Sequence, residues 1–103
     1  MPGPERRHPR IRCNARIQGS GMSKSFSGRV RDLSGTGLFL ETRQFIPVGR
    51  QVYLEFELRT GPVEVMGEVR WLARGPEQPE QGMGIRFLRM SAASARAVDE
   101  ALR

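Results

Sequence analysis

The chain has 103 residues, enough for one domain but too few for two independent hydrophobic cores. Its 17 Lys and Arg against 11 Asp and Glu give a net charge of +6, nearly all of it from arginine because Lys24 is the sole lysine. Since no apolar run approaches the roughly 20 residues of a membrane span and the N-terminus is charged where a signal peptide is apolar, we expect a cytoplasmic protein.

Apolar and polar residues alternate along most of the chain, which predicts β-strands. In residues 11–18 the odd positions are apolar and the even positions are polar, and residues 26–31 form a second strand after a flexible turn at Gly19–Ser25. Asp32–Gly37 then breaks the pattern, and Leu38–Glu41 resumes it briefly. This half of the sequence therefore predicts three strands.

The second half predicts three more strands and a helix. Residues 52–58 alternate most clearly, and a turn at Thr60–Pro62 leads to a strand from Val63 to Trp71, with Trp71 on its apolar face and a bulge permitted at Gly67. Residues 83–88 form the last strand after the polar loop 74–81. The terminal helix is predicted by Ser91 as its N-cap and by three apolar residues at helical spacing, Ala95, Val98 and Leu102.

Six short strands joined by hairpin-length connections favour a sheet that closes on itself, because closure removes exposed edges. We therefore expect an all-β fold, a small six-stranded antiparallel β-barrel with a C-terminal α-helix. Residues 1–10 are predicted to be a flexible arm, and residues 11–103 the barrel and helix. Cys13 is the only cysteine, so no internal disulfide can form, and we expect a buried structural thiol.

A first cluster of candidate binding residues, Arg6, Arg7 and Arg10, precedes the first strand. Pro9 favours an extended backbone there, and the spacing of Arg6 and Arg10 allows both guanidinium groups to reach one ligand. A guanidinium group matches two phosphate oxygens or a guanine edge with its planar fork of donors. The same residues taken alone are also typical of a disordered basic tail.

A second cluster, Asp32–Gly37, lies between two strands. The Asp32 carboxylate could accept hydrogen bonds from a guanine edge, and the Ser34 hydroxyl could bind phosphate or fix the loop. The glycines permit positive φ close to a ligand. Asp, Ser and Gly are also the ordinary residues of a turn, so the cluster alone leaves both interpretations open.

The order and separation of the two clusters resemble the PilZ domain family, whose signature is RxxxR before the first strand and (D/N)xSxxG after the second. Here these motifs are Arg6–Arg10 and Asp32–Gly37. Further stretches that look like the family are residues 28–30, 48–49, 68–71 and 84–87. Each motif is weak alone, but together they are fairly specific and extend over nearly the whole chain.

The resemblance implies a six-stranded barrel that binds cyclic di-GMP and has no catalytic activity. We expect no cofactor and no metal. Carried over residue by residue, the resemblance assigns the ligand to Arg6, Arg10, Asp32, Ser34 and Gly37, and Arg7 is a candidate auxiliary cation beside them. Trp71 is a further candidate to approach a base, although its place on the apolar face favours packing in the core. Such a receptor would change conformation on binding and pass a second-messenger signal to a protein partner in bacterial motility, biofilm or polysaccharide control.

Three other functions are compatible with parts of the sequence to different degrees. The single histidine, His8, and the lack of a phosphate-binding loop or metal-ligand cluster argue against an enzyme. A basic barrel could bind single-stranded nucleic acid, but few aromatic residues are available outside the predicted core. A PilZ-like adaptor could also bind a protein and no nucleotide. We expect a monomer or weak dimer with one ligand per chain, Glu5 standing where another cation would help to hold a stacked ligand dimer.

Overall fold

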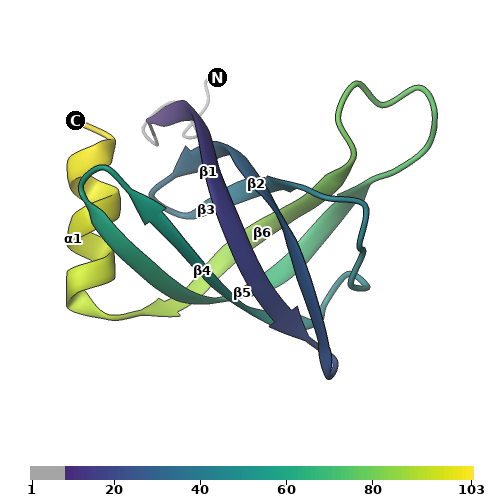
Figure 1. Ribbon diagram of the computed structural model, residues 1–103, viewed down its shortest axis with the longest axis horizontal. Helices are drawn as coiled ribbons and strands as arrows, with labels where there is room; N and C mark the ends of the chain where they lie inside the picture. The colour runs from purple at the N-terminus through teal and green to yellow at the C-terminus, as the bar shows by residue number, and fades with distance from the viewer. Residues whose placement is uncertain (1–8) are drawn as a thin grey trace, which may run out of the picture.

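The computed structural model describes residues 9–103, which form six β-strands and one α-helix (Figure 1). The strands pair antiparallel in the order β1-β2-β3-β6-β5-β4 and close into a barrel. This confirms the predicted fold class, a small antiparallel barrel with a C-terminal helix. The bounds are β1 Arg10–Gly21, β2 Lys24–Ser34, β3 Gly37–Glu41, β4 Gln51–Leu58, β5 Gly61–Ala73, β6 Gly82–Met90 and α1 Ala92–Ala101.

The barrel interior is filled by the apolar side chains that alternate along each strand. In β4 the four residues Val52, Leu54, Phe56 and Leu58 are buried, while Gln51 and its alternate neighbours are partly or fully exposed. Burying a side chain of this size contributes about 1.5–3 kcal/mol. Because one face of each strand is used in this way, the polar side chains of the strands are left on the outside of the barrel.

The two strands of the first hairpin are longer than the sequence indicated. The predicted flexible turn Gly19–Ser25 is wrong, because β1 and β2 stay paired as far as Gly21 and Lys24. The turn is only Met22 and Ser23, whose positive φ values of 51° and 62° match the two-residue turns that suit a twisted hairpin. This stretch consists mostly of Gly and Ser, so its sequence shows no alternation of apolar and polar residues. The hydropathy pattern therefore could not show that the backbone pairing of β1 and β2 continues.

The second predicted break, Asp32–Gly37, is also too long. β2 continues through Asp32 to Ser34 and β3 begins at Gly37, so the turn consists of Gly35 and Thr36. A register shift between Val30 and Asp32 marks a bulge in β2. This bulge interrupts the period of two and explains why the pattern appears to stop before Asp32.

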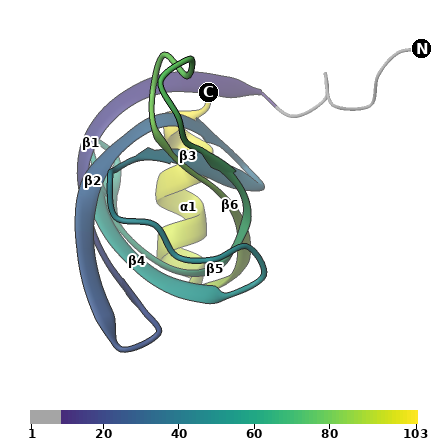
Figure 2. The ribbon, with the colours of Figure 1, turned by 90° about the vertical axis from the view of Figure 1, so that its right-hand side faces the viewer.

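Helix α1 closes one end of the barrel, as the view along the barrel shows (Figure 2). Ser91 is confirmed as its N-cap, since the Ser91 Oγ accepts a 3.1 Å hydrogen bond from the backbone N–H of Ser94. The buried face is Ser94, Ala97 and Val98, whereas Ala95 is exposed, contrary to the predicted apolar face. Within residues 9–103 no helix is long and apolar enough to span a bilayer.

Cys13 is half-buried against the core rather than fully buried as expected. It lies in β1 within the register shift between Arg12 and Ala15, where the strand bulges away from its partner. The alternation of inner and outer positions continues through this part of β1, and Ile11 and Ala15 on the same face are half-buried as well. Full burial begins at Ile17 further along the strand.

The contact of α1 with β5 depends on a buried hydroxyl, and this yields a prediction. Ser94 Oγ accepts a 3.0 Å hydrogen bond from the backbone N–H of Glu64. Replacing Ser94 with Ala leaves that N–H without this acceptor, and we expect a loss of about 1–3 kcal/mol in the free energy of unfolding, measured by urea denaturation. Arg96→Ala, on the exposed face of the same helix, should change it by less than about 0.5 kcal/mol. Equal effects of the two substitutions would contradict this role.

Candidate functional site

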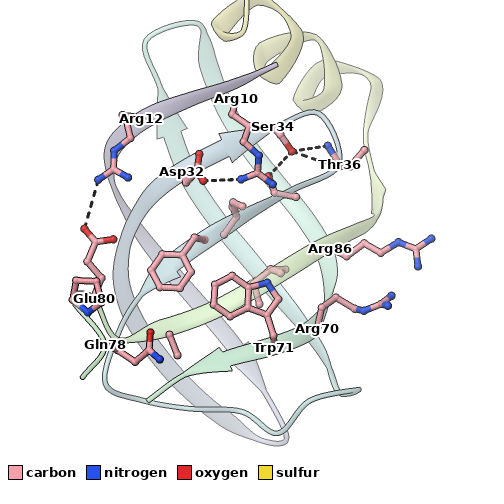
Figure 3. A pocket seen from close by; sticks show the side chains of 17 residues that line it. Arg10, Arg12, Asp32, Ser34, Thr36, Arg70, Trp71, Gln78, Glu80 and Arg86 are labelled. Carbon is pink, nitrogen blue, oxygen red and sulfur yellow. Dashed lines mark hydrogen bonds and ion pairs between the residues drawn. The ribbon is translucent and has the colours of Figure 1, made fainter. Parts of the chain in front are cut away.

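A cavity of about 500 Å³ lies on the outside of the barrel and is lined by residues of β1, β2, β3, β5, β6 and the β5–β6 loop (Figure 3). Five of the residues selected from the sequence line it: Arg10, Asp32, Ser34, Gly37 and Trp71. The other two, Arg6 and Arg7, lie outside the described residues. Segments far apart in the sequence thus contribute to one concave surface.

The floor of this cavity follows a single row of cross-strand partners. Across neighbouring strands, Arg12 is paired with Asp32, Asp32 with Phe39, Phe39 with Gly84, and Gly84 with Trp71. The row crosses five of the six strands, β1, β2, β3, β6 and β5. Partners in an antiparallel ladder have Cβ atoms about 4.5–5.5 Å apart. The register of the sheet therefore places a cation, a carboxylate and two aromatic rings next to one another.

An ion pair joins the two sequence motifs at this cavity. The guanidinium group of Arg10 donates a 2.7 Å hydrogen bond from Nη1 to Oδ2 of Asp32. The Arg10 side chain is 66% exposed and that of Asp32 is 26% exposed. Pairs with this much solvent contact are worth at most about 1 kcal/mol, so a ligand can replace either partner at low cost. The pair keeps both groups directed at the cavity.

The Ser34 hydroxyl is used to build the turn between β2 and β3. Ser34 Oγ accepts a 3.2 Å hydrogen bond from the backbone N–H of Thr36 and lies 3.3 Å from both the Thr36 hydroxyl and the carbonyl oxygen of Gly37. Ser34 itself is only 3% exposed. Of the two roles that the sequence left open for this hydroxyl, the geometry supports fixing the loop.

Gly37 is required for a different reason from the one predicted. Among the described glycines, positive φ occurs at Gly49, Gly61 and Gly75, not in the Asp32–Gly37 turn. A Cβ atom at Gly37 would instead collide with the carbonyl oxygen of Ile85 on β6. The glycine of this motif therefore permits the close approach of β3 to β6 beneath the cavity.

Trp71 lies on the surface and lines the cavity, so the predicted packing in the core is wrong. A register shift between Val69 and Trp71 interrupts the alternation of β5, and Trp71 is 51% exposed. Its indole ring stacks beside the ring of Phe39, with centroids 5.3 Å apart and planes 17° from parallel. A Cβ atom at Gly84 would collide with the indole, so the glycine makes room for it. Two rings thus form a fixed aromatic surface.

Positive charge exceeds negative charge around the cavity. Its lining includes four arginines, Arg10, Arg12, Arg70 and Arg86, against two acids, Asp32 and Glu80. Sequence reasoning missed Arg12 and Phe39 as site residues. The period of two in β1 places Arg12 on the same face as Arg10 and could have identified it, whereas Phe39 could be found only from the register of β3 against β6.

Two observations concern metal-ligating and titratable groups in residues 9–103. No group of three or more His, Cys, Asp or Glu that could hold a metal ion occurs in this part of the chain. The pKa of Tyr53 is raised to about 12, mainly because its hydroxyl donates a 2.9 Å hydrogen bond to Glu55 and also because nearby carboxylates disfavour the phenolate. Tyr53 lies on β4, which contributes no residue to the cavity lining.

Solved structures with the same fold share little sequence with this chain. The chain resembles the inhibitor of motility MotI/DgrA from Bacillus subtilis with a TM-score of 0.79 and 16% identity, covering 99% of this chain but only 54% of that protein. For the PilZ domain of YcgR from Escherichia coli, solved with c-di-GMP, the TM-score is 0.72 and the identity 18%, over 93% of this chain and 87% of that one. These likenesses support the barrel architecture.

A third likeness is to the PilZ domain of CeSA from a cellulose-synthesising bacterium, with a TM-score of 0.62, 15% identity, and coverage of 90% of this chain and 93% of that one. No curated protein sequence matches this chain. A family model for the PilZ domain, however, matches residues 4–103. Because this match extends over nearly the whole sequence and the barrel agrees with it, the chain belongs to the PilZ domain family.

Proposed function

We propose that this protein is a cyclic di-GMP receptor and that the cavity over the row from Arg12 to Trp71 is its binding site. The observation that carries the proposal is the 2.7 Å contact of Arg10 with Asp32, which brings the two family motifs into one cavity. The excess of arginines around it suits an anionic ligand. The E. coli YcgR domain solved with c-di-GMP has the same fold and supports this choice of ligand.

Each side chain of the cavity has a distinct proposed role. The Asp32 carboxylate accepts from the N1–H and N2–H donors of a guanine, and Arg10 contacts the other guanine edge or a phosphate. The Trp71 indole offers a flat surface for stacking on a base. Ser34 and Gly37 shape the turn that carries Asp32. Arg6 and Arg7 complete the site from the segment that precedes β1.

The proposed output is a signal to a protein partner. In this proposal, contacts of Arg6 and Arg7 with the bound ligand change the surface that a partner in motility, biofilm or polysaccharide control can contact. We propose one ligand per chain, a monomer or weak dimer, and a cytoplasmic location. PilZ domains are ligand-binding adaptors, and no catalytic step is assigned to this chain.

The single-stranded nucleic-acid alternative is not favoured by the placement of the aromatic residues. Phe26 and Phe56 are buried in the core, whereas Trp71 and Phe39 meet in one place. Sequence-independent binding of a strand uses several stacking platforms along a groove. A single pair of rings beside a carboxylate is better suited to a ligand of one or two bases.

The first test is the preference for a guanine dinucleotide. We expect calorimetric titration to show tighter binding of cyclic di-GMP than of cyclic di-AMP, because adenine presents an acceptor at N1 where guanine presents a donor to Asp32. GTP should also bind more weakly, because it has one guanine where the proposed site contacts a dinucleotide. Arg10→Ala and Asp32→Ala should each weaken binding by at least about tenfold. Arg16→Ala is the matched control, an exposed β1 arginine that does not line the cavity, and it should bind like the wild type. Equal affinity of the wild type for all three nucleotides would refute the proposal.

The second test uses Trp71, the only tryptophan in the chain. Its intrinsic fluorescence should be quenched by cyclic di-GMP if a base stacks on the indole. Trp71→Phe should retain most of the affinity because it keeps an aromatic face, and Trp71→Ala should lose roughly tenfold, in line with the worth of one base–aromatic stack. Unchanged fluorescence together with unchanged affinity of Trp71→Ala would place Trp71 outside the ligand site.

A further inference from the structure

One wall of the cavity is formed by the loop 74–81 between β5 and β6. This loop contains no residue of either family motif. Gln78, Pro79 and Glu80 of this loop line the cavity. Gln81 and Arg74 attach the ends of the loop to residues 42 and 45, and Glu80 joins its cavity-lining part to arginines on β1 and β2. Figure 3 draws Arg12 and Glu80 facing each other at one side of the cavity.

The two arginines that meet Glu80 differ in their other contacts. Arg31 lies 3.5 Å from Glu80, but it also pairs with Glu41 at 3.0 Å and donates a 2.8 Å hydrogen bond to Asn14. Arg12 lies 3.6 Å from the same Glu80 oxygen, and its side chain is 74% exposed. Arg31 would therefore keep its partners if Glu80 moved, whereas Arg12 would be left with its charge facing the cavity.

Arg12 is also placed for direct contact with an anion in the cavity. It is the cross-strand partner of Asp32, yet the Asp32 carboxylate is held by Arg10 and not by Arg12. The charge of Arg12 is thus balanced by a carboxylate from a loop, across a long and largely solvated ion pair. Such ion pairs contribute little to stability. A phosphate group whose two oxygens both accept hydrogen bonds from the guanidinium group can therefore displace the carboxylate.

We propose that Arg12 is a further phosphate-binding residue of this site and that Glu80 is a built-in competitor that occupies Arg12 until the ligand arrives. The proposal rests on the function proposed above, because it takes a cyclic dinucleotide as the source of the phosphate. Glu80 lowers the affinity for every anionic ligand by the same competition. Only a ligand that also engages Asp32 and the aromatic surface gains enough from the rest of the cavity to take Arg12 from Glu80.

The test is a double-mutant cycle on Arg12 and Glu80 with cyclic di-GMP as the titrant. Glu80→Gln should tighten binding by roughly two- to fivefold, since it removes the competing charge from a solvated ion pair. Arg12→Ala should weaken binding and make the affinity less sensitive to salt. In the Arg12→Ala background, Glu80→Gln should give no gain in affinity, because the arginine for which Glu80 and the ligand compete is absent.

Matched controls separate competition at Arg12 from a general change of charge. Glu77→Gln makes the same charge change in the same loop at a residue that does not line the cavity, and Arg16→Ala removes a β1 arginine away from it. Both should leave affinity within about twofold of the wild type. An equal gain from Glu80→Gln with and without Arg12, an equal gain from Glu77→Gln, or a loss of affinity in Glu80→Gln would each overturn the proposal.

A measurement without ligand keeps this inference separate from the proposed function. Amide hydrogen exchange of residues 74–81 in the free protein should be faster in Glu80→Gln and in Arg12→Ala than in Glu77→Gln, because the loop loses an attachment. Unchanged exchange would show that the Arg12–Glu80 pair does not hold the loop and would overturn the competitor role. If the wild type fails to bind cyclic di-GMP while the exchange result holds, the proposed function fails and phosphate binding by Arg12 fails with it, but the loop attachment stands.

Discussion

The register between β1 and β2 is the constraint on which the arrangement of the cavity depends. It sets Arg10 opposite Ser34 and Arg12 opposite Asp32, so that cations of the first strand meet the polar end of the second. A slip of one residue would turn these side chains into the barrel and the apolar set out of it. The burial of Ile17, Val30 and Leu33 therefore fixes the charged surface as firmly as it fixes the core.

The aromatic part of the cavity results from departures from regular strand geometry. The bulge between Val69 and Trp71 leaves the indole on the outside, and Gly84, with no side chain, leaves space for it beside Phe39. Aromatic side chains that lean over a glycine in a sheet protect its backbone and gain a flat contact. The same arrangement leaves half of the Trp71 surface open to solvent, which is the property a stacking site requires.

The electrostatic contacts of the cavity are weak in a way that suits exchange with a ligand. Arg10 and Arg12 remain 66% and 74% exposed although each faces a carboxylate. Solvated ion pairs orient side chains but contribute little to the free energy of unfolding. Separating a buried ion pair would instead cost several kcal/mol. The fold is held by its apolar interior, and the polar surface over β1, β2 and β5 is left free to reorganise.

The sequence by itself determined the strand count, the barrel, the capped helix and the two motifs, because a period of two and the N-cap residue Ser91 are local signals. Resemblance to a family added the ligand, which no composition could supply. Only the tertiary structure decided that Trp71 lies outside the core, that Gly37 serves a close strand approach, and that Phe39 belongs to the cavity. These depend on bulges and on register between strands distant in sequence, and such pairings are set by the packing of the whole barrel and leave no signal in any single segment.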